Sequence, residues 1–161
     1  MGSGEGYFYD FLRKHRQFNG QYVGLELIEQ FHQSALEKYD QDENTQFICD
    51  EFLNYDFGDQ KFDWVFSLGS LSVKQDNMPE RDLAFCRKMV ELSHYGISVY
   101  LNDLKFFKKG YLEEVENLAI HDIDDFLKML AQNFSPITLQ IDRMLPTAPH
   151  GVIIHMTWPT Q

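Results

Sequence analysis

Three glycines near the start of the chain and a carboxylate 20 residues later have the types and spacing of a nucleotide-binding site. Gly2, Gly4 and Gly6 stand immediately before a predicted helix. Glycine lets the backbone approach a ligand closely, and a helix start presents free N–H groups. Glu26 follows Gly6 by 20 residues, where dinucleotide-binding folds place the carboxylate that binds ribose hydroxyls. The alternatives are an artificial linker for the glycines and an ordinary exposed strand end for Glu26.

A short acidic stretch is the second candidate contact for a nucleoside. Asp50 and Glu51 come at the end of a strand predicted over 46–50. The Asp50 carboxylate could accept a hydrogen bond from an adenine amino group, and Phe52 or Leu53 could pack on the purine ring. Taken by itself, an ordinary acidic loop is the simpler interpretation of this stretch.

Small residues make the third candidate contact. A buried strand predicted over 62–68 opens into a loop that contains Ser67, Gly69 and Ser70. Small residues at the carboxyl end of a strand leave room for a ligand in the crevice where open α/β sheets bind. A plain strand and turn is the alternative interpretation.

The elements that must position these residues alternate between helix-like and strand-like segments. This alternation predicts an α/β fold with a mainly parallel sheet. The segments follow from apolar residues at helical spacing and from short β-branched or aromatic runs. Helices are predicted over 7–17, 28–39, 79–94 and 122–132, and strands over 21–27, 46–50, 62–68, 97–101, 137–144 and 151–158. We therefore expect one domain over residues 1–161.

Composition and charge argue against several classes of partner. The 161 residues include 25 acidic and 14 basic side chains, for a net charge of −11. Such a surface repels phosphate backbones and anionic lipids, so neither nucleic acid nor a membrane is expected as a partner. A neutral or cationic small molecule, or a protein, fits better. Cys49 and Cys86 are far apart, and no membrane span or signal peptide is evident, so we expect a cytoplasmic protein without disulfides.

The histidines do not follow a metal-binding pattern. None of the six forms a HxxxH or HExxH pair, so no metal site is expected. His121 with Asp122 could act as a general base near the substrate, although a helix cap beside a surface histidine is the commoner arrangement. Phe106, Phe107 and Tyr111 follow a strand end and could line a substrate pocket or simply pack.

Together these segments resemble the class I, Rossmann-like S-adenosylmethionine (SAM) dependent methyltransferases over nearly the whole chain. The features that match are the glycine loop of 2–6, the acidic strand end of 23–26, Asp50, the Phe-Asp-hydrophobic strand of 62–67 and the closing strand pair of 137–158. The single motifs are loose, but their order and spacing are specific to the family.

The resemblance implies a Rossmann-like α/β fold with an antiparallel last strand, SAM as the cofactor and methyl transfer to a small-molecule or protein acceptor. It assigns Gly2, Gly4 and Gly6 to the amino-acid part of the cofactor, Glu26 to the ribose, Asp50, Glu51 and Phe52 to the adenine, and Ser67, Gly69 and Ser70 to the sulfonium. The substrate would lie beyond Asn102 and Asp103. Because methyl transfer does not always require a dedicated base, no catalytic residue is assigned.

One departure from the family concerns the centre of the sheet. The family has a strand before the glycine loop, where this chain has only Met1. We therefore expect an N-terminally truncated domain, in which each buried backbone group left unpaired would cost about 1–3 kcal/mol. A homodimer, a rearranged sheet or missing residues could cover the gap. Two alternatives stay open: a non-catalytic or fragmentary binding and assembly module and, more weakly, a nicotinamide-dependent oxidoreductase, which Glu26 also suits.

Overall fold

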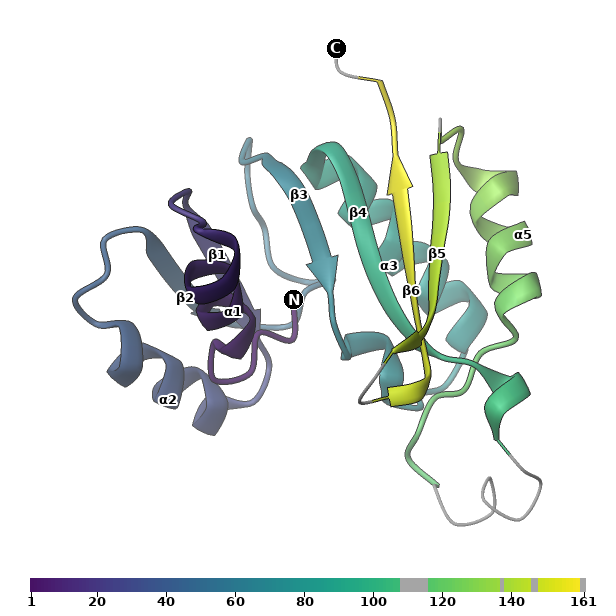
Figure 1. The fold of residues 1–161 in the computed structure, drawn as a ribbon, viewed down its shortest axis with the longest axis horizontal. Coiled ribbons are helices and arrows are strands. Elements are labelled where there is room, and N and C mark those ends of the chain that lie inside the picture. The colour runs from purple at the N-terminus through teal and green to yellow at the C-terminus, as the bar shows by residue number, and fades with distance from the viewer. Residues whose placement is uncertain (108–115, 137, 146–147, 160–161) are drawn as a thin grey trace. The chain divides into compact units, whose positions relative to one another are not determined.

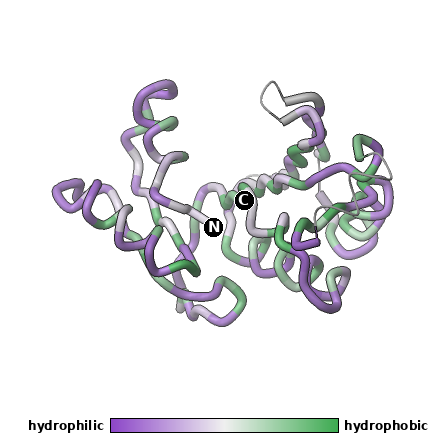
Figure 2. The backbone as a smooth tube through the Cα atoms, turned by 90° about the horizontal axis from the view of Figure 1, so that it is seen from below, coloured by the Kyte–Doolittle hydropathy of each residue, from purple (hydrophilic) through white to green (hydrophobic). Residues whose placement is uncertain are grey.

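The computed structural model describes residues 1–107, 116–136, 138–145 and 148–159. The chain forms two compact units, Met1–Gly58 and Asp59–Gln161, which we call unit 1 and unit 2. In each unit, parallel strands are joined by helices (Figure 1). Hydrophilic segments are spread through both units (Figure 2), in keeping with the large share of charged residues. No helix in these described ranges is both long and apolar enough to span a membrane.

Unit 1 is a strand–helix–strand unit preceded by a helix. Its elements are α1 (Tyr7–Arg16), β1 (Tyr22–Glu26), α2 (Glu29–Tyr39) and β2 (Thr45–Cys49). Strands β1 and β2 pair in parallel, with Glu26 opposite Cys49. Since parallel strands need a crossover connection, α2 supplies it, and the carboxyl ends of both strands meet at one edge.

Aromatic rings fill the interior of unit 1. Tyr9 of α1 is almost fully buried, and its ring lies 5.0 Å from that of Tyr22 and 5.3 Å from that of Tyr39. Phe47 of β2 stacks on Tyr39 at 5.4 Å. An added Cβ at Gly24 would lie 2.7 Å from the Phe47 ring, so this position of β1 requires glycine. The rings thereby fix how α1 and α2 pack on the strands.

Unit 2 is built on a four-stranded mixed sheet in the order β3-β4-β6-β5. Its elements are β3 (Phe62–Ser67), the 3-10 turn η1 (Ser70–Ser72), α3 (Met78–Leu92), β4 (Ser93–Asn102), the 3-10 turn η2 (Leu104–Phe106), α5 (Ile123–Asn133), β5 (Thr138–Leu145) and β6 (Ala148–Thr157). Strands β3 and β4 are parallel, whereas β6 runs antiparallel to both β4 and β5.

Cross-strand apolar pairs form the core of unit 2. Alternate residues of β4 and β6 are fully buried and stand opposite one another, as Val99 does with Ile154 and Leu101 with Val152. Burying each of these side chains contributes about 1.5–3 kcal/mol. Helix α3 adds Phe85 to this core.

On the other face of this sheet, each of the four strands contributes one side chain to a continuous hydrogen-bonded chain. Trp64 Nε1 donates to Ser98 Oγ at 2.7 Å, and Ser98 Oγ lies 2.7 Å from His155 Nδ1. His155 Nε2 lies 3.2 Å from Asp142 Oδ2. Because the indole only donates and the carboxylate only accepts, Ser98 donates to His155, and His155 donates to Asp142.

The predicted α/β fold with helices and an antiparallel last strand is confirmed, and the helix cap expected at Asp122 is present. The helix predicted over 79–94 ends at Leu92, and β4, which we predicted from residue 97, already begins at Ser93 and continues through Gly96. A Cβ at Gly96 would lie 2.8 Å from the Trp64 ring and 2.7 Å from the Met156 carbonyl oxygen. Glycine is therefore needed there for packing within the strand. That residues 1–161 form a single, truncated domain stays a prediction.

The four-strand hydrogen-bonded chain leads to a stability prediction. Ser98→Ala leaves the half-buried side chains of Trp64 and His155 without their partner, so the free energy of unfolding should fall by about 1–3 kcal/mol in urea denaturation. The control is Gln140→Ala, which removes only an exposed contact to Asp142 and should change stability by less than about 0.5 kcal/mol. Equal effects of the two substitutions would contradict a structural role for the chain.

Candidate functional site

The glycine loop of unit 1 has a backbone conformation that favours glycine at three positions. Gly2, Gly4 and Gly6 have φ angles of 61°, 53° and 80°, in the left-handed region that side chains disfavour. Ser3 N–H donates to the Leu25 carbonyl oxygen at 3.1 Å, which fixes the loop against the end of β1. The three glycines thus shape a turn that leads directly into α1.

Glu26 holds this loop in place with both of its carboxylate oxygens. Oε2 accepts a hydrogen bond from Gly4 N–H at 2.8 Å, and Oε1 accepts one from Ile28 N–H at 3.0 Å. Glu26 is only 6% exposed. The structure therefore brings the predicted glycines and the predicted carboxylate together, as their spacing required. Each oxygen keeps a further lone pair, so the clamp leaves acceptor capacity toward hydroxyl groups.

Two features of the loop suit a ligand with polar groups. The Oγ of Ser3 is buried and has no hydrogen-bond partner among the described residues. A Cβ built on Gly4 meets nothing within 4 Å, so this side of the loop faces open space. In addition, no side-chain hydrogen bond caps the start of α1, and the start of a helix favours an anionic group. The loop therefore fits the amino-acid part of a nucleoside cofactor.

The acidic stretch follows β2 at the same edge. Asp50 N–H donates to the Glu26 carbonyl oxygen at 3.1 Å, which places the two acidic residues side by side. Asp50 Oδ1 accepts from Glu51 N–H at 2.6 Å. Phe52 is buried, and its ring lies 6.0 Å from that of Phe57. Asp50 is thus close to Glu26, whereas Phe52 packs within its own loop.

Sequence reasoning missed two apolar residues that directly follow Glu26. Leu27 is 63% exposed and Ile28 49%, which is unusual for residues between a buried strand and its helix. The exposed thiol of Cys49 lies 4.0 Å from the Leu27 carbonyl oxygen. Two consecutive apolar residues in a polar turn were the signal that could have revealed this surface, since a flat apolar ligand would cover it.

Unit 2 holds the remaining predicted contacts. Ser67 ends β3 and is fully buried, yet its Oγ has no hydrogen-bond partner among the described residues. Gly69 has a φ of 132°, and a Cβ there would meet nothing within 4 Å. Ser70 begins η1. The ten predicted cofactor residues thus form two clusters, one in each unit: the glycines, Glu26 and the acidic stretch in unit 1, and the small-residue loop in unit 2.

The proposed general base has a different partner from the expected one. Asp122 caps α5 by accepting from Asp124 N–H and Asp125 N–H. His121 is not a surface residue: its Nε2 lies 3.1 Å from Asp82 Oδ2 on α3, and both side chains are buried. Phe106 is exposed at η2, and Tyr111 lies outside the described residues. No group of three metal-binding side chains occurs in the described ranges.

A cavity of about 660 Å³ occupies another part of unit 1 and involves none of the predicted residues. It is lined by Arg13, Glu37, Lys38, Tyr39, Asp40, Gln41, Asp42, Glu43 and Asn44. With four carboxylates and two amides around it, the cavity lacks the apolar lining of a typical small-molecule site.

Comparison with known proteins shows the family to which this chain belongs. Residues 1–92, more than half of the chain, match the family model described as a methyltransferase domain. The chain belongs to the methyltransferase domain family. The resemblance to class I methyltransferases seen in the sequence is thereby confirmed. No curated protein sequence matches the chain significantly.

Solved structures of methyltransferases share the fold. Magnesium protoporphyrin IX methyltransferase from Synechocystis PCC 6803, with bound S-adenosylhomocysteine (SAH), is similar at a TM-score of 0.74 and 18% identity, with 98% of this chain and 72% of that chain covered. Phosphoethanolamine N-methyltransferase 2 from Haemonchus contortus, in complex with SAM, gives 0.75 and 14%, with 98% and 47% covered. A complex of a methyltransferase with its activator from Haloferax volcanii gives 0.73 and 14%, with 98% and 80% covered. At these sequence identities the structural similarity establishes the fold alone. The present chain spans about half of the length of the Haemonchus contortus enzyme.

The clamp by Glu26 gives a prediction that needs no ligand. Glu26→Gln replaces one carboxylate oxygen by an NH₂ group, so either Gly4 N–H or Ile28 N–H loses its acceptor. The free energy of unfolding should fall by about 1–3 kcal/mol, measured by urea denaturation. Glu37→Gln, at an exposed position in the last turn of α2, is the matched control and should change stability by less than about 0.5 kcal/mol. An unchanged free energy of unfolding in Glu26→Gln would show that these two hydrogen bonds do not stabilise the glycine loop.

Proposed function

We propose that this methyltransferase domain transfers a methyl group from SAM to a small-molecule acceptor. The observation that carries the proposal is the direct hydrogen bond from the glycine loop to Glu26, because it joins the two parts of the sequence that should hold one nucleoside. The family match and the SAM- and SAH-bound relatives support SAM as the cofactor. SAM supplies an electrophilic methyl group on a sulfonium, and the protein supplies position and electrostatics.

Each cluster has a proposed task. The glycine loop binds the amino-acid part with its backbone, and Glu26 accepts from the ribose hydroxyls. Asp50 and Glu51 face the adenine, and the buried Phe52 supports this adenine-binding loop from within. Ser67, Gly69 and Ser70 flank the sulfonium, where small residues leave room for the methyl group. Holding donor and acceptor in line is worth roughly 7–11 kcal/mol of the barrier.

The acceptor and the partners belong to the same proposal. The relatives act on unrelated molecules, such as a magnesium porphyrin and a phosphoethanolamine, so they do not define the acceptor of this chain. The net charge of −11 favours a neutral or cationic acceptor and argues against nucleic acid and anionic membranes. A cytoplasmic protein fits this composition.

A second candidate function is a non-catalytic binding or assembly module. Strands β1 and β3 each pair with one described strand only, in two separate sheets. An unpaired strand edge is a template for another chain, so a homodimer that adds strands there would extend either sheet. Loss of cofactor binding together with a stable dimer in sedimentation would favour this module over the enzyme.

Calorimetry with SAH and NAD tests the cofactor. We expect SAH to bind and NAD not to bind. Glu26→Ala should weaken SAH binding by about 1–3 kcal/mol, which is typical of hydrogen bonds to a carboxylate. Glu37→Ala, at an exposed position in the last turn of α2, should leave the affinity unchanged. Binding of NAD alone would favour an oxidoreductase, and binding of neither ligand would favour the assembly module.

Cysteine labelling provides a second, local readout. Cys49 is exposed beside Glu26, whereas Cys86 is fully buried and burial raises the pKa of its thiol to about 12. A maleimide should therefore label only Cys49, since the thiolate is the reactive form. Saturating SAH should slow this labelling at least threefold, because the bound ligand would cover the exposed surface formed by Leu27, Ile28 and Cys49. Cys49→Ser should abolish labelling altogether, and an unchanged rate with bound SAH would place the adenine elsewhere.

A further inference from the structure

A buried histidine–carboxylate pair in unit 2 has no part in the proposed cofactor site. His121 Nε2 lies 3.1 Å from Asp82 Oδ2, and the two side chains are only 5% and 7% exposed. Because a carboxylate only accepts, Nε2 carries the proton, and in the neutral imidazole Nδ1 is therefore an acceptor. Nδ1 is buried and has no hydrogen-bond partner among the described residues. A buried polar atom without a partner is rare and costly, so it requires an explanation.

His121 stands at the edge of the sheet where ligands bind in this class of fold. Its N–H donates to the Asn102 carbonyl oxygen at 2.8 Å, and its carbonyl oxygen accepts from Leu104 N–H at 3.0 Å. Two residues earlier, Ala119 N–H donates to the Ser72 carbonyl oxygen at 2.8 Å. The segment thus connects the end of β4 with η1, directly after the small-residue loop. This is the carboxyl edge of parallel strands β3 and β4, where open α/β sheets hold their ligands.

The ring of His121 is held in one orientation. Asp82 fixes the Nε2 side, and the Phe126 ring of α5 meets the imidazole edge to face at 5.7 Å. An imidazole held by a carboxylate on one nitrogen, with the other nitrogen free, is the arrangement of a general base and its orienting group. The buried setting strengthens the interaction between the pair, since the local dielectric is low.

We propose that His121 accepts the proton of the methyl acceptor, with Asp82 as its positioning residue. This inference rests on the proposed function of the same domain. As the acceptor's nucleophilic atom forms its bond to the methyl carbon, the carbon–sulfur bond breaks, and the acceptor's proton passes to His121 Nδ1. The imidazolium then carries both protons beside the Asp82 carboxylate, and the proton leaves to solvent after product release.

This role specifies the chemical class of the acceptor. Only a nucleophile that bears a hydrogen can donate to Nδ1, so the acceptor is an alcohol, a phenol, a thiol or an amine, and a carboxylate is excluded. Three exposed apolar side chains lie on segments next to the His121 segment: Val73, Leu104 and Phe106. Val73 forms a β-bridge with Leu118, and Leu104 N–H donates to the His121 carbonyl oxygen. The acceptor therefore has an apolar body that these side chains contact.

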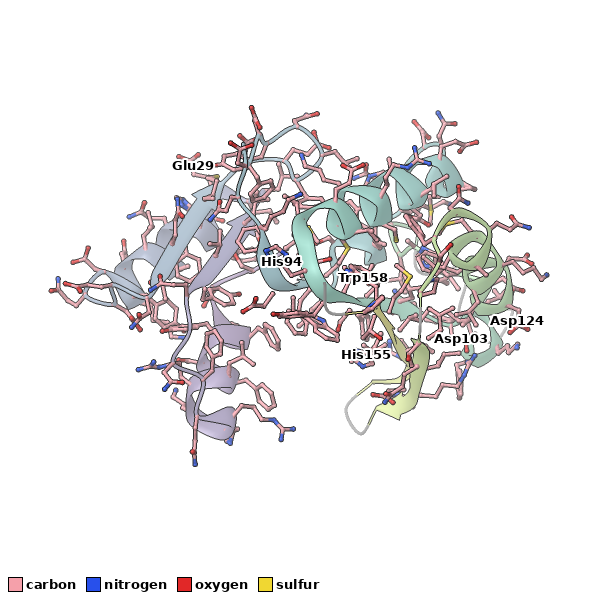
Figure 3. All side chains as sticks on the ribbon, turned by 90° about the horizontal axis from the view of Figure 1, so that it is seen from above. Glu29, His94, Asp103, Asp124, His155 and Trp158 are labelled. Atoms are coloured by element: carbon pink, nitrogen blue, oxygen red, sulfur yellow. The ribbon has the colours of Figure 1, made fainter. Side chains whose placement is uncertain are left out.

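The first experiment follows the His121 ring in the full chain by NMR with ¹⁵N-labelled histidine. Without any addition, His121 should show a protonated Nε2 and a bare Nδ1. Phenol or benzylamine at millimolar concentration should shift the Nδ1 signal, and benzoate should not. The control is His94→Asn, an exposed histidine at the other end of β4 from Asp103 (Figure 3), which should leave these responses intact. If neither phenol nor benzylamine shifts the Nδ1 signal, the proposal is overturned.

The second experiment measures methyl transfer from radiolabelled SAM to phenol or benzylamine. His121→Asn should lower the rate by roughly 100–10,000-fold, the contribution of a general base, while SAH affinity stays within twofold of the native value. Asp82→Asn can donate to the ring, which should move the proton from Nε2 to Nδ1 in the NMR spectrum and lower the rate similarly. Native rates in a folded His121→Asn protein would also overturn the proposal. Failure to bind SAH would instead remove the proposed function, while the ring response to phenol would still decide the role of His121.

Discussion

The carboxylate of Glu26 is the interaction on which unit 1 depends. One side chain accepts hydrogen bonds from the glycine loop before α1 and from the first residue before α2, while its own backbone continues β1. Three elements therefore meet at a single buried charge. Burying a carboxylate is costly unless hydrogen bonds compensate for its lost hydration, and two N–H groups do so here. The same charge limits how far the loop can move without uncovering an unpaired anion.

How much of this could be read from the sequence depended on the distance over which each signal acts. Local signals were reliable: the spacing from Gly6 to Glu26, the Asp122 cap and the reversed closing strands all follow from rules within one or two elements. The pairing of His121 with Asp82 could not be predicted, because 39 residues separate them and only tertiary packing joins them. The early start of β4 at Ser93 escaped prediction for a similar reason, since the Trp64 ring that requires glycine at position 96 belongs to another strand.

Buried polar atoms without partners are concentrated near the carboxyl ends of the parallel strands. Among the described residues they belong to Ser3, Ser67, Ser72 and His121. Each such atom lowers stability, and proteins retain this kind of defect mostly where a ligand or a reaction needs it. The well-satisfied chain from Trp64 to Asp142 shows that the same molecule can pair its polar groups elsewhere. The contrast supports the location of function at the carboxyl ends of the parallel strands within each unit.

That chain of four side chains also has a consequence for how unit 2 folds. A sheet whose strands slide by one residue turns every side chain to the opposite face, and apolar alternation alone tolerates some sliding by two. Ser98 can meet His155 only when the two stand directly opposite, as they do here. A shift of the register by two residues would break these hydrogen bonds, even though apolar residues would still face the core. The hydrogen-bonded chain therefore specifies the register of these strands. It selects one alignment from several that hydrophobic burial alone would permit.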